Sequence, residues 1–423
     1  MYKINGGINI KKDHFSTGIT EDQVLLVGEK NENIEELKEL TLTAGGNIKG
    51  YIKYRKDNVN PAHYVGTGKL NQIKNFVLNQ NINLIIFDCE LTPAQLRNLE
   101  EELEIRVIDR TQLILDIFSL HAKTKESKLQ VEKAQLEYML SRLTGKGEEM
   151  SRLAGGIGTR GPGESKLETD RRRINKRIHR LKNELEEIKK TRDVQRQDRK
   201  DPIIALAGYT NAGKSTLLNQ LTEADKLVAD QLFATLDSTM RNFELPGGKS
   251  AIISDTVGFI RDLPHGLIAS FRATLEEINQ ADIIIHLVDG SSDDIDKKMN
   301  TVKNVLADIT EEEKEEILVF NKIDLLNAEK EQFLRSCYPD AIFISAKTGK
   351  NINDLLEKIQ EIVYRDFKTI AGVIGYEDAN LIEKLHNNGE VEKEEYIQEG
   401  IYIKAYAPKS LAEKINKKIK KPS

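Results

Sequence analysis

Long apolar runs are missing from this 423-residue sequence, and none approaches the roughly 18 residues needed to cross a bilayer. The first residues, MYKINGGINIKKDHF, also lack the apolar core of a secretory signal. Cysteine is scarce: Cys89 and Cys337 are the only two, and both lie in or beside apolar stretches. We therefore expect reduced core thiols in place of a disulfide or a metal site. These absences predict a cytoplasmic protein without a membrane span.

An overall excess of positive charge is missing too, since the formal net charge is −5. Residues 166–200 nevertheless contain 14 Lys or Arg and 7 Asp or Glu, a local charge of +7, so the remaining residues carry −12. A concentrated basic segment on an acidic chain is typical of a localised contact with a polyanion. A solvated helix face, or a structural coiled coil that holds two α/β domains apart, would have the same composition.

The hydrophobic pattern changes along the chain and predicts separate domains. In residues 1–125, short apolar strands alternate with amphipathic helices from Gln23 onward, which predicts an N-terminal parallel α/β domain. The alternation returns in residues 201–365, where runs such as DIIIHLVD predict strands buried on both faces of a parallel sheet. Residues 366–423 are short and polar, and they predict a small C-terminal α+β domain.

The segment between the two α/β domains, residues 126–200, has the spacing of a helical hairpin. Apolar side chains recur there at intervals of three, four and seven residues, the pattern of an a/d seam. The seam residues are Leu129, Leu136, Leu140, Leu143, Leu167, Ile174, Ile178, Leu181, Leu185 and Ile188. Five glycines and a proline in residues 155–163 predict a loop without a helix of its own at the tip of an antiparallel pair.

A phosphate-binding loop is predicted after the strand Ile203–Ala207, because the sequence G-x-x-x-x-G-K-S follows in a strand–loop–helix context. The glycines let backbone N–H groups surround phosphates, Lys214 reaches the β/γ oxygens, and the Ser215 hydroxyl can ligate Mg²⁺. The N-terminus of the next helix favours negative charge. The candidate contacts are Gly208, Tyr209, Thr210, Asn211, Ala212, Gly213, Lys214, Ser215 and Thr216.

The base is predicted by a second motif, Asn321-Lys322-Ile323-Asp324, at the end of the strand EILVF. Guanine presents N1–H and N2–H₂ side by side, and the Asp324 carboxylate can only accept hydrogen bonds. Adenine would leave this charged acceptor unpaired, so the motif favours GTP and GDP over ATP. The segment Ser345-Ala346-Lys347, after the next strand, is placed for backbone contact with the guanine O6.

The metal and the γ-phosphate are predicted to meet the end of the strand SAIISD. We expect Asp255 to hold Mg²⁺ through a water, and Thr256 and Val257 to lead to Gly258, whose N–H would face the γ-phosphate. A hydroxyl on a mobile loop has to complete the Mg²⁺ shell. The polar segment DQLFATLDSTMR offers Thr235, Ser238 and Thr239 for this role.

A water-orienting glutamine is also missing. Many GTP-hydrolysing proteins carry one directly after Asp-x-x-Gly, but here the residue is Phe259. One replacement would be a monovalent cation, K⁺, held by the Asn211 side chain and offsetting the charge that develops on the phosphates. Another would be a partner that orders the Thr235 and Phe259 loops in trans. The alternative is that Phe259 packs away and another side chain, such as His265, positions the water.

Several segments closely resemble the HflX family of translation-factor-class GTPases. They are GGIGTRGPGESKLETDRRRI (155–174), FATLDST (233–239), DTVGFIRDLPHGLIASFRATLEE (255–277) and YVGTGKL (64–70). The resemblance extends from about Gln23 to Ala407. It implies that Thr235 is the Mg²⁺ and γ-phosphate threonine. It also implies that its neighbours line the nucleotide site, namely Phe233, Ala234, Leu236 and Asp237.

The resemblance further implies a cytoplasmic Mg²⁺-dependent GTPase that binds the large (50S) subunit or the 70S ribosome. Such proteins split or rescue ribosomes or control protein synthesis, and the hairpin tip would approach the peptidyl-transferase region. We expect the ribosome to stimulate hydrolysis and the free protein to be a monomer. The candidate rRNA contacts are Arg160, Arg171, Arg172, Arg173, Lys176 and Arg177.

Two other functions are compatible with a phosphate-binding loop. A GTPase subunit of an RNA-modifying enzyme would need a catalytic cysteine or a cofactor fingerprint, and the sequence offers neither. A metabolic kinase or ATPase that binds ATP is disfavoured, because adenine would leave the Asp324 carboxylate without a hydrogen-bond donor.

Overall fold

The computed structural model describes residues 22–29, 31–55, 59–153, 162–196, 201–222, 239–246, 248–256, 258–261, 278–310, 314–365 and 367–419. The chain divides into two compact units. The first comprises Met1–Thr191, Val228–Asp237 and Val257–Leu275, and the second comprises Arg192–Leu227, Ser238–Thr256 and Glu276–Ser423. Across the described residues, no helix has the length and apolar character that a bilayer crossing requires.

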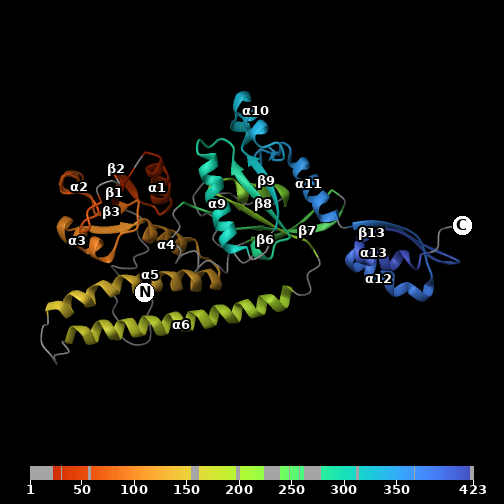
Figure 1. Cartoon of the computed structure of the whole chain (residues 1–423), viewed down its shortest axis with the longest axis horizontal. Coiled ribbons are helices and arrows are strands. Elements are labelled where there is room, and N and C mark those ends of the chain that lie inside the picture. The colour runs from red at the N-terminus through yellow and green to blue at the C-terminus, as the bar shows by residue number, and fades with distance from the viewer. Residues whose placement is uncertain are drawn as a thin grey trace. The chain divides into compact units, whose positions relative to one another are not determined.

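The first unit contains a four-stranded parallel sheet of order β2-β1-β3-β4 (Figure 1). The strands are β1 (Gln23–Gly28), β2 (Asn47–Lys53), β3 (Leu84–Phe87) and β4 (Arg106–Asp109). The helices are α1 (Asn31–Thr43), α2 (Thr67–Gln80), α3 (Pro93–Leu103) and α4 (Arg110–His121). All four residues of β3 are buried, as expected for a strand covered on both faces. The predicted parallel α/β fold is confirmed here.

Two long helices follow, α5 (Lys125–Leu153) and α6 (Pro162–Arg196), and Figure 1 shows them side by side and antiparallel. The seam residues Leu129, Ile174, Ile178 and Leu181 are buried. The prediction of a loop through residue 163 is wrong at its end, because Pro162 begins α6. Proline suits the first position of a helix, where its fixed φ is already helical and its missing N–H has no partner to lose.

Helix α5 is attached to the end of β4 by a buried carboxylate. Asp109 accepts hydrogen bonds from the Tyr138 hydroxyl and from Arg142 Nη2, both at 2.6 Å. The Arg142 guanidinium also lies 4.2 Å from the centroid of the Tyr138 ring. Asp109 is fully buried, and it also accepts from the backbone N–H groups of Leu91 and Gln112, so its charge is satisfied by four donors. This contact fixes the direction in which the hairpin leaves the sheet.

The second unit contains a six-stranded sheet of order β10-β9-β8-β5-β7-β6. Its strands are β5 (Ile203–Gly208), β6 (Thr239–Glu244), β7 (Ser250–Asp255), β8 (Ile283–Asp289), β9 (Glu315–Asn321) and β10 (Ile342–Phe343). Its helices are α7 (Lys214–Leu221), α9 (Ile295–Ile309), α10 (Ala328–Cys337) and α11 (Ile352–Tyr364), with a short 3₁₀ helix η3 (Ile323–Leu325). Strands β5, β7, β8 and β9 match the predicted strands Ile203–Ala207, SAIISD, DIIIHLVD and EILVF, and β10 is the further strand expected before Ser345.

Strand β6 was not predicted, and it pairs antiparallel with β7 at the edge of the otherwise parallel sheet. Its sequence, TMRNFE, lacks the apolar run of a central strand because its faces are only partly covered: within residues 240–244 only Phe243 is buried.

Both cysteines are free thiols, but the expectation of a core position is wrong for Cys337, which is exposed at the end of α10.

The last segment is a small α+β fold, as predicted. It consists of β11 (Phe367–Ile374), the 3₁₀ helix η4 (Tyr376–Asp378), α12 (Ala379–Asn388), β12 (Glu390–Ile397), β13 (Gly400–Pro408) and α13 (Lys409–Asn416). The three strands form an antiparallel sheet of order β11-β13-β12. Alternate residues of β13, among them Ile401 and Ile403, pack with Leu385 of α12 and Ile415 of α13 on one face of the sheet. The four predicted domain limits stay predictions.

Candidate nucleotide-binding site

The predicted phosphate-binding loop connects β5 to α7 and is shaped by two positions where the chain needs a glycine. A Cβ on Gly208 would lie 2.4 Å from the Leu287 carbonyl oxygen. Gly213 has φ of +94°, and a Cβ there would lie 2.2 Å from Asn321 Nδ2. Asn211 also has positive φ, +60°, a conformation that asparagine tolerates better than most residues. Because these glycines have no Cβ, the loop packs closely against β8 and Asn321, and no side chain at these positions covers its backbone.

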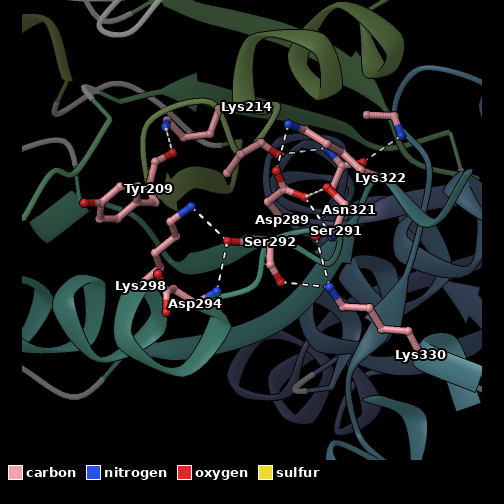
Figure 2. Close-up of polar contacts among 12 residues, drawn as sticks. Tyr209, Lys214, Asp289, Ser291, Ser292, Asp294, Lys298, Asn321, Lys322 and Lys330 are labelled. Atoms are coloured by element: carbon pink, nitrogen blue, oxygen red, sulfur yellow. Dashed lines mark hydrogen bonds and ion pairs between the residues drawn. The ribbon is translucent and has the colours of Figure 1, made fainter. Parts of the chain in front are cut away.

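Lys214, the first residue of α7, is buried against this loop (Figure 2). Its Nζ donates to the Gly208 and Tyr209 carbonyl oxygens, both at 3.0 Å. Burial lowers the pKa of Lys214 to about 8, and the nearby Asp255 carboxylate opposes that effect. A desolvated ammonium group gains much from an anionic partner, so this position suits a phosphate.

Asp255 and Ser215 form the second part of the site. The Ser215 hydroxyl donates to Asp255 Oδ2 at 2.9 Å, and Asp255 is buried at the end of β7. The next residue, Thr256, is tied to β5 because its hydroxyl donates to the Leu206 carbonyl at 2.6 Å. A hydroxyl and a carboxylate in contact are the oxygen ligands that Mg²⁺ prefers, and Mg²⁺ usually takes its remaining ligands from phosphates and water. The residues present fit that ion.

Asn321 joins three segments that are far apart in the sequence. Its Nδ2 donates to the Ala212 carbonyl at 2.9 Å, and its Oδ1 accepts from the Ala346 N–H at 2.9 Å. Asp324, three residues later, is exposed, but its Oδ1 accepts from the Ser345 hydroxyl at 2.6 Å. The carboxylate is thus oriented while remaining accessible to a ligand. The base-reading motif and the phosphate-binding loop meet at this edge of the sheet.

Sequence reasoning missed Asp289, which lies at the end of β8 directly opposite Asn321 in the sheet. Its Oδ2 pairs with Lys322 Nζ at 2.8 Å, and its Oδ1 accepts from the Ser291 N–H and hydroxyl at 2.9 and 2.6 Å (Figure 2). Burial acts to raise the pKa of Asp289, but the bonds from Lys322 and Ser291 outweigh it and hold that pKa below its usual range. A signal for this residue exists in the sequence: β8 ends in Asp at the carboxyl edge of the sheet, where ligands bind.

The turn after Asp289 is held by two lysines. Lys330 Nζ donates to the Ser291 and Ser292 carbonyls at 3.0 and 2.9 Å, and Lys298 Nζ donates to the Ser292 hydroxyl at 2.9 Å (Figure 2). Lys298 also lies 5.4 Å from the centroid of the Tyr209 ring, in the phosphate-binding loop. Lys298 thus links the turn to the phosphate-binding loop, and Asp289 links it to the base-reading motif through Lys322.

Other predicted residues lie elsewhere or outside the described part of the chain. Gly258 is half-buried. Phe259 is only 3% exposed. Ile260 is buried as well and belongs to a core cluster of the first unit. The Phe259 ring therefore packs away, as one of the alternatives had it. The site predictions outside the described residues are Phe233, Ala234, Thr235, Leu236, Asp237, Ser238, Val257, His265 and Arg160. Of the other hydroxyl candidates, Thr239 begins β6.

The basic candidates on α6 fall into two groups. Arg171, Arg172, Arg173 and Lys176 are exposed. Arg177 instead donates through Nε and Nη2 to the two carboxylate oxygens of Glu132 on α5, at 2.7 and 2.8 Å, and this pairing raises its pKa. Arg177 therefore contributes to holding the two helices together, which the sequence could not reveal.

Three family models match consecutive parts of the chain. Residues 31–119 match a GTP-binding GTPase N-terminal region, residues 121–199 a GTP-binding GTPase middle region, and residues 203–322 a 50S ribosome-binding GTPase. The GTPase HflX of Caldanaerobacter subterraneus is 47% identical over 390 residues, which cover 92% of this chain and 90% of that protein. The chain belongs to the HflX family. The GTPase HflX of Escherichia coli is 43% identical over 335 residues, 78% of this chain and 79% of that protein.

Membership of the HflX family agrees with the site geometry. The chain is a P-loop GTPase, and both its phosphate-binding loop and its guanine motif lie in or beside the region matched to the ribosome-binding GTPase model. The resemblance inferred from short segments is therefore confirmed over nearly the whole sequence.

Gly213→Ala should weaken GTP binding by at least about tenfold and destabilise the protein by about 1–3 kcal/mol. The new methyl group would collide with Asn321 Nδ2 in a backbone conformation that alanine adopts poorly. Fluorescent-nucleotide titration and chemical denaturation measure the two effects. Gly68→Ala on α2 is the matched control, since nothing lies within 4 Å of a Cβ there. Unchanged GTP affinity in Gly213→Ala would contradict the assigned role of this loop.

Proposed function

We propose that this chain is a Mg²⁺-dependent GTPase that binds the large ribosomal subunit and is stimulated by the ribosome. Its role would be ribosome splitting or rescue, or the control of protein synthesis. The observation that carries the choice of guanine is the exposed Asp324 carboxylate, oriented by the Ser345 hydroxyl at 2.6 Å. The match of residues 203–322 to a 50S ribosome-binding GTPase supports the ribosomal partner.

In this proposal the N–H groups of Gly208–Thr216 surround the phosphates of GTP. Lys214 exchanges its contacts with loop carbonyls for contacts with phosphate oxygens, which relieves the cost of its burial. Asp324 accepts from guanine N1–H and N2–H₂, and the segment Ser345–Lys347 contacts O6. Asn321 holds the base-reading loop against the phosphate-binding loop, and the Asp289–Lys322 pair holds it against the end of β8.

Ser215 and, through a water, Asp255 would hold Mg²⁺, together with Thr235 as the resemblance to the HflX family implies. When bound, the ion supplies positive charge to the β/γ-phosphate oxygens. The chain's own residues would orient the phosphates and, through the Gly258 N–H, sense the γ-phosphate. Asn211 offers a neutral oxygen for a K⁺ ion beside the same phosphates.

The exposed cations of α6 are the proposed ribosome contact. Four of them are carried within a few residues on one helix, and rRNA presents a dense array of phosphates. The structural interpretation of the hairpin is supported in part as well, since the Arg177–Glu132 pair and the buried seam hold α5 to α6. The two roles are compatible, because different side chains serve them.

Reversing Arg171, Arg172 and Lys176 to glutamate should weaken binding to large subunits by at least about tenfold and reduce the slope of log K against log salt by about 2–3. The slope falls because each phosphate contact that the variant no longer makes is one from which binding no longer releases a counterion. Sedimentation with large subunits over a range of KCl concentrations measures both quantities, and GTP affinity should not change. Lys190→Glu, exposed farther along the same helix, is the control. Binding that is insensitive to salt in the parent protein would favour a purely structural hairpin.

The function itself is tested by sedimentation of the full chain with purified ribosomal subunits, in GDP or in a non-hydrolysable GTP analogue. We expect co-sedimentation with the large subunit in the GTP-like state. Failure to bind large subunits in either state would overturn the proposal.

A further inference from the structure

The hairpin formed by β12 and β13 carries an exposed apolar patch with acidic surroundings. Tyr376 is 52% exposed, Tyr396 71% and Ile397 37%, and exposed apolar side chains that lie together, unlike single ones, often mark a contact site. The Tyr376 hydroxyl donates to the Ile397 carbonyl at 2.7 Å, which holds η4 against the end of β12. We call these three residues the tyrosine patch. They lie on two separate segments and are brought together only by the fold.

The charge around the tyrosine patch is negative. Residues 390–399 contain five glutamates and a single lysine, and Glu377 and Asp378 follow Tyr376 directly in the sequence. Three of the hairpin's glutamates have cationic or imidazole partners inside the same small fold: Glu392 with Lys404, Glu394 with His386 and Glu395 with Lys393. Asp378 is paired as well, with Lys418. The seven acids still outnumber the three lysines Lys393, Lys404 and Lys418, so negative charge remains in excess. A hydrogen bond with the Glu394 carboxylate raises the pKa of Tyr396, which places that ring beside an acid.

Protection of an edge strand does not explain this arrangement. β12 is an edge of its sheet, and charged side chains on an edge discourage pairing with other chains. That function accounts for Lys393 and Glu395. It does not account for Tyr396 and Ile397, because exposed apolar groups at the end of an edge strand favour association.

We propose that the tyrosine patch is a docking surface for a basic protein of the large ribosomal subunit, and not for rRNA. Tyrosine is enriched among the residues that dominate binding energies at protein interfaces. An acidic rim repels phosphates and attracts a surface rich in lysine and arginine, so charge complementarity selects protein over RNA. The proposal rests on the proposed ribosomal function and assigns a second, chemically different contact to the C-terminal fold.

The first experiment replaces Tyr396 by a photo-crosslinking amino acid, Tyr396→p-benzoylphenylalanine, in the full chain. The variant is irradiated on purified large subunits with a non-hydrolysable GTP analogue. We expect an adduct that survives ribonuclease and has the added mass of one ribosomal protein. An adduct that ribonuclease removes, or one between two copies of this chain, would overturn the inference.

The second experiment measures the sign of the charge effect. Glu399→Lys, in the turn between β12 and β13, should weaken large-subunit binding by about three- to tenfold if the partner is basic, but strengthen it if the partner is rRNA. Tyr396→Ser should weaken binding by about 30-fold while leaving the thermal midpoint unchanged, since this side chain is largely exposed. Glu357→Lys, exposed on α11, makes the same charge change away from the hairpin and is the control.

The outcomes separate this inference from the function on which it rests. If the parent protein does not bind large subunits, the proposed function fails. If the parent binds and Tyr396→Ser binds equally well, the ribosomal function stands and the docking surface is wrong.

Discussion

Asp324→Asn should lower the affinity for GTP by about 10²–10⁴-fold and move the preference toward xanthosine triphosphate. Two charge-assisted hydrogen bonds to guanine N1–H and N2–H₂ are lost, each worth about 1.5–3 kcal/mol. The C2 carbonyl of xanthine can instead accept from the new amide N–H. The effect should be large because the Ser345 hydroxyl orients the carboxylate at 2.6 Å, so the parent protein loses little entropy when it binds the base.

Competition titrations with GTP, ATP and xanthosine triphosphate measure this change. Asp340→Asn, also an exposed aspartate of the second unit, is the control and should leave all three affinities unaltered. A Ser345→Ala variant should show a smaller loss of GTP affinity in the same direction, because the carboxylate stays but is no longer oriented. Parent-like GTP affinity in Asp324→Asn would remove the basis for choosing GTP over ATP.

The second large effect is on hydrolysis, which we expect to be slow in the free protein, about 10⁻³ s⁻¹ or less, and accelerated by about 10³-fold or more on large subunits. Phe259 stands where many other GTPases carry a water-orienting glutamine, and this residue is only 3% exposed. A buried phenyl ring holds no water for attack. We expect the missing group to come from an ion or from the partner, and His265 is the alternative within the chain.

Single-turnover hydrolysis in KCl and in NaCl, with and without large subunits, separates these sources. We expect K⁺ to accelerate the reaction modestly, by about three- to tenfold, and Asn211→Gly to abolish that difference. Glycine is the suitable replacement because Asn211 has φ of +60°, which glycine adopts without strain. His265→Ala is the control. A rate that is already fast without ribosomes, unaffected by K⁺, and lost in His265→Ala would reverse this interpretation.

Much of the site could be predicted because its motifs are local. A phosphate-binding loop needs particular residues at fixed spacing between one strand and one helix, so Gly208–Thr216 is visible in the sequence. Strands buried on both faces must be apolar along their whole length, and this requirement makes β5, β7, β8 and β9 recognisable from their residues alone. The order of the two motifs was sufficient to choose guanine.

Other features depend on which residues the fold brings together, and no local spacing encodes those. Asp289 meets Lys322 because β8 and β9 pair in one particular register. Arg177 lies opposite Glu132 because α6 runs back along α5 with one particular offset, and the pairing gives this candidate rRNA contact a partner within the hairpin. A one-residue change in either register would have separated these pairs.

The sequence by itself determined the motifs on which the chemistry rests: a phosphate-binding loop, a candidate carboxylate for guanine, and a phenylalanine where a catalytic glutamine is usual. These motifs depend on residue identity and on the geometry of residues that are close together in the sequence. Only the tertiary structure decided which charged groups pair within the protein and which remain exposed to partners. It paired Arg177, left Arg171 and Lys176 exposed, and joined Tyr376 to the end of β12, because such contacts link residues distant in sequence.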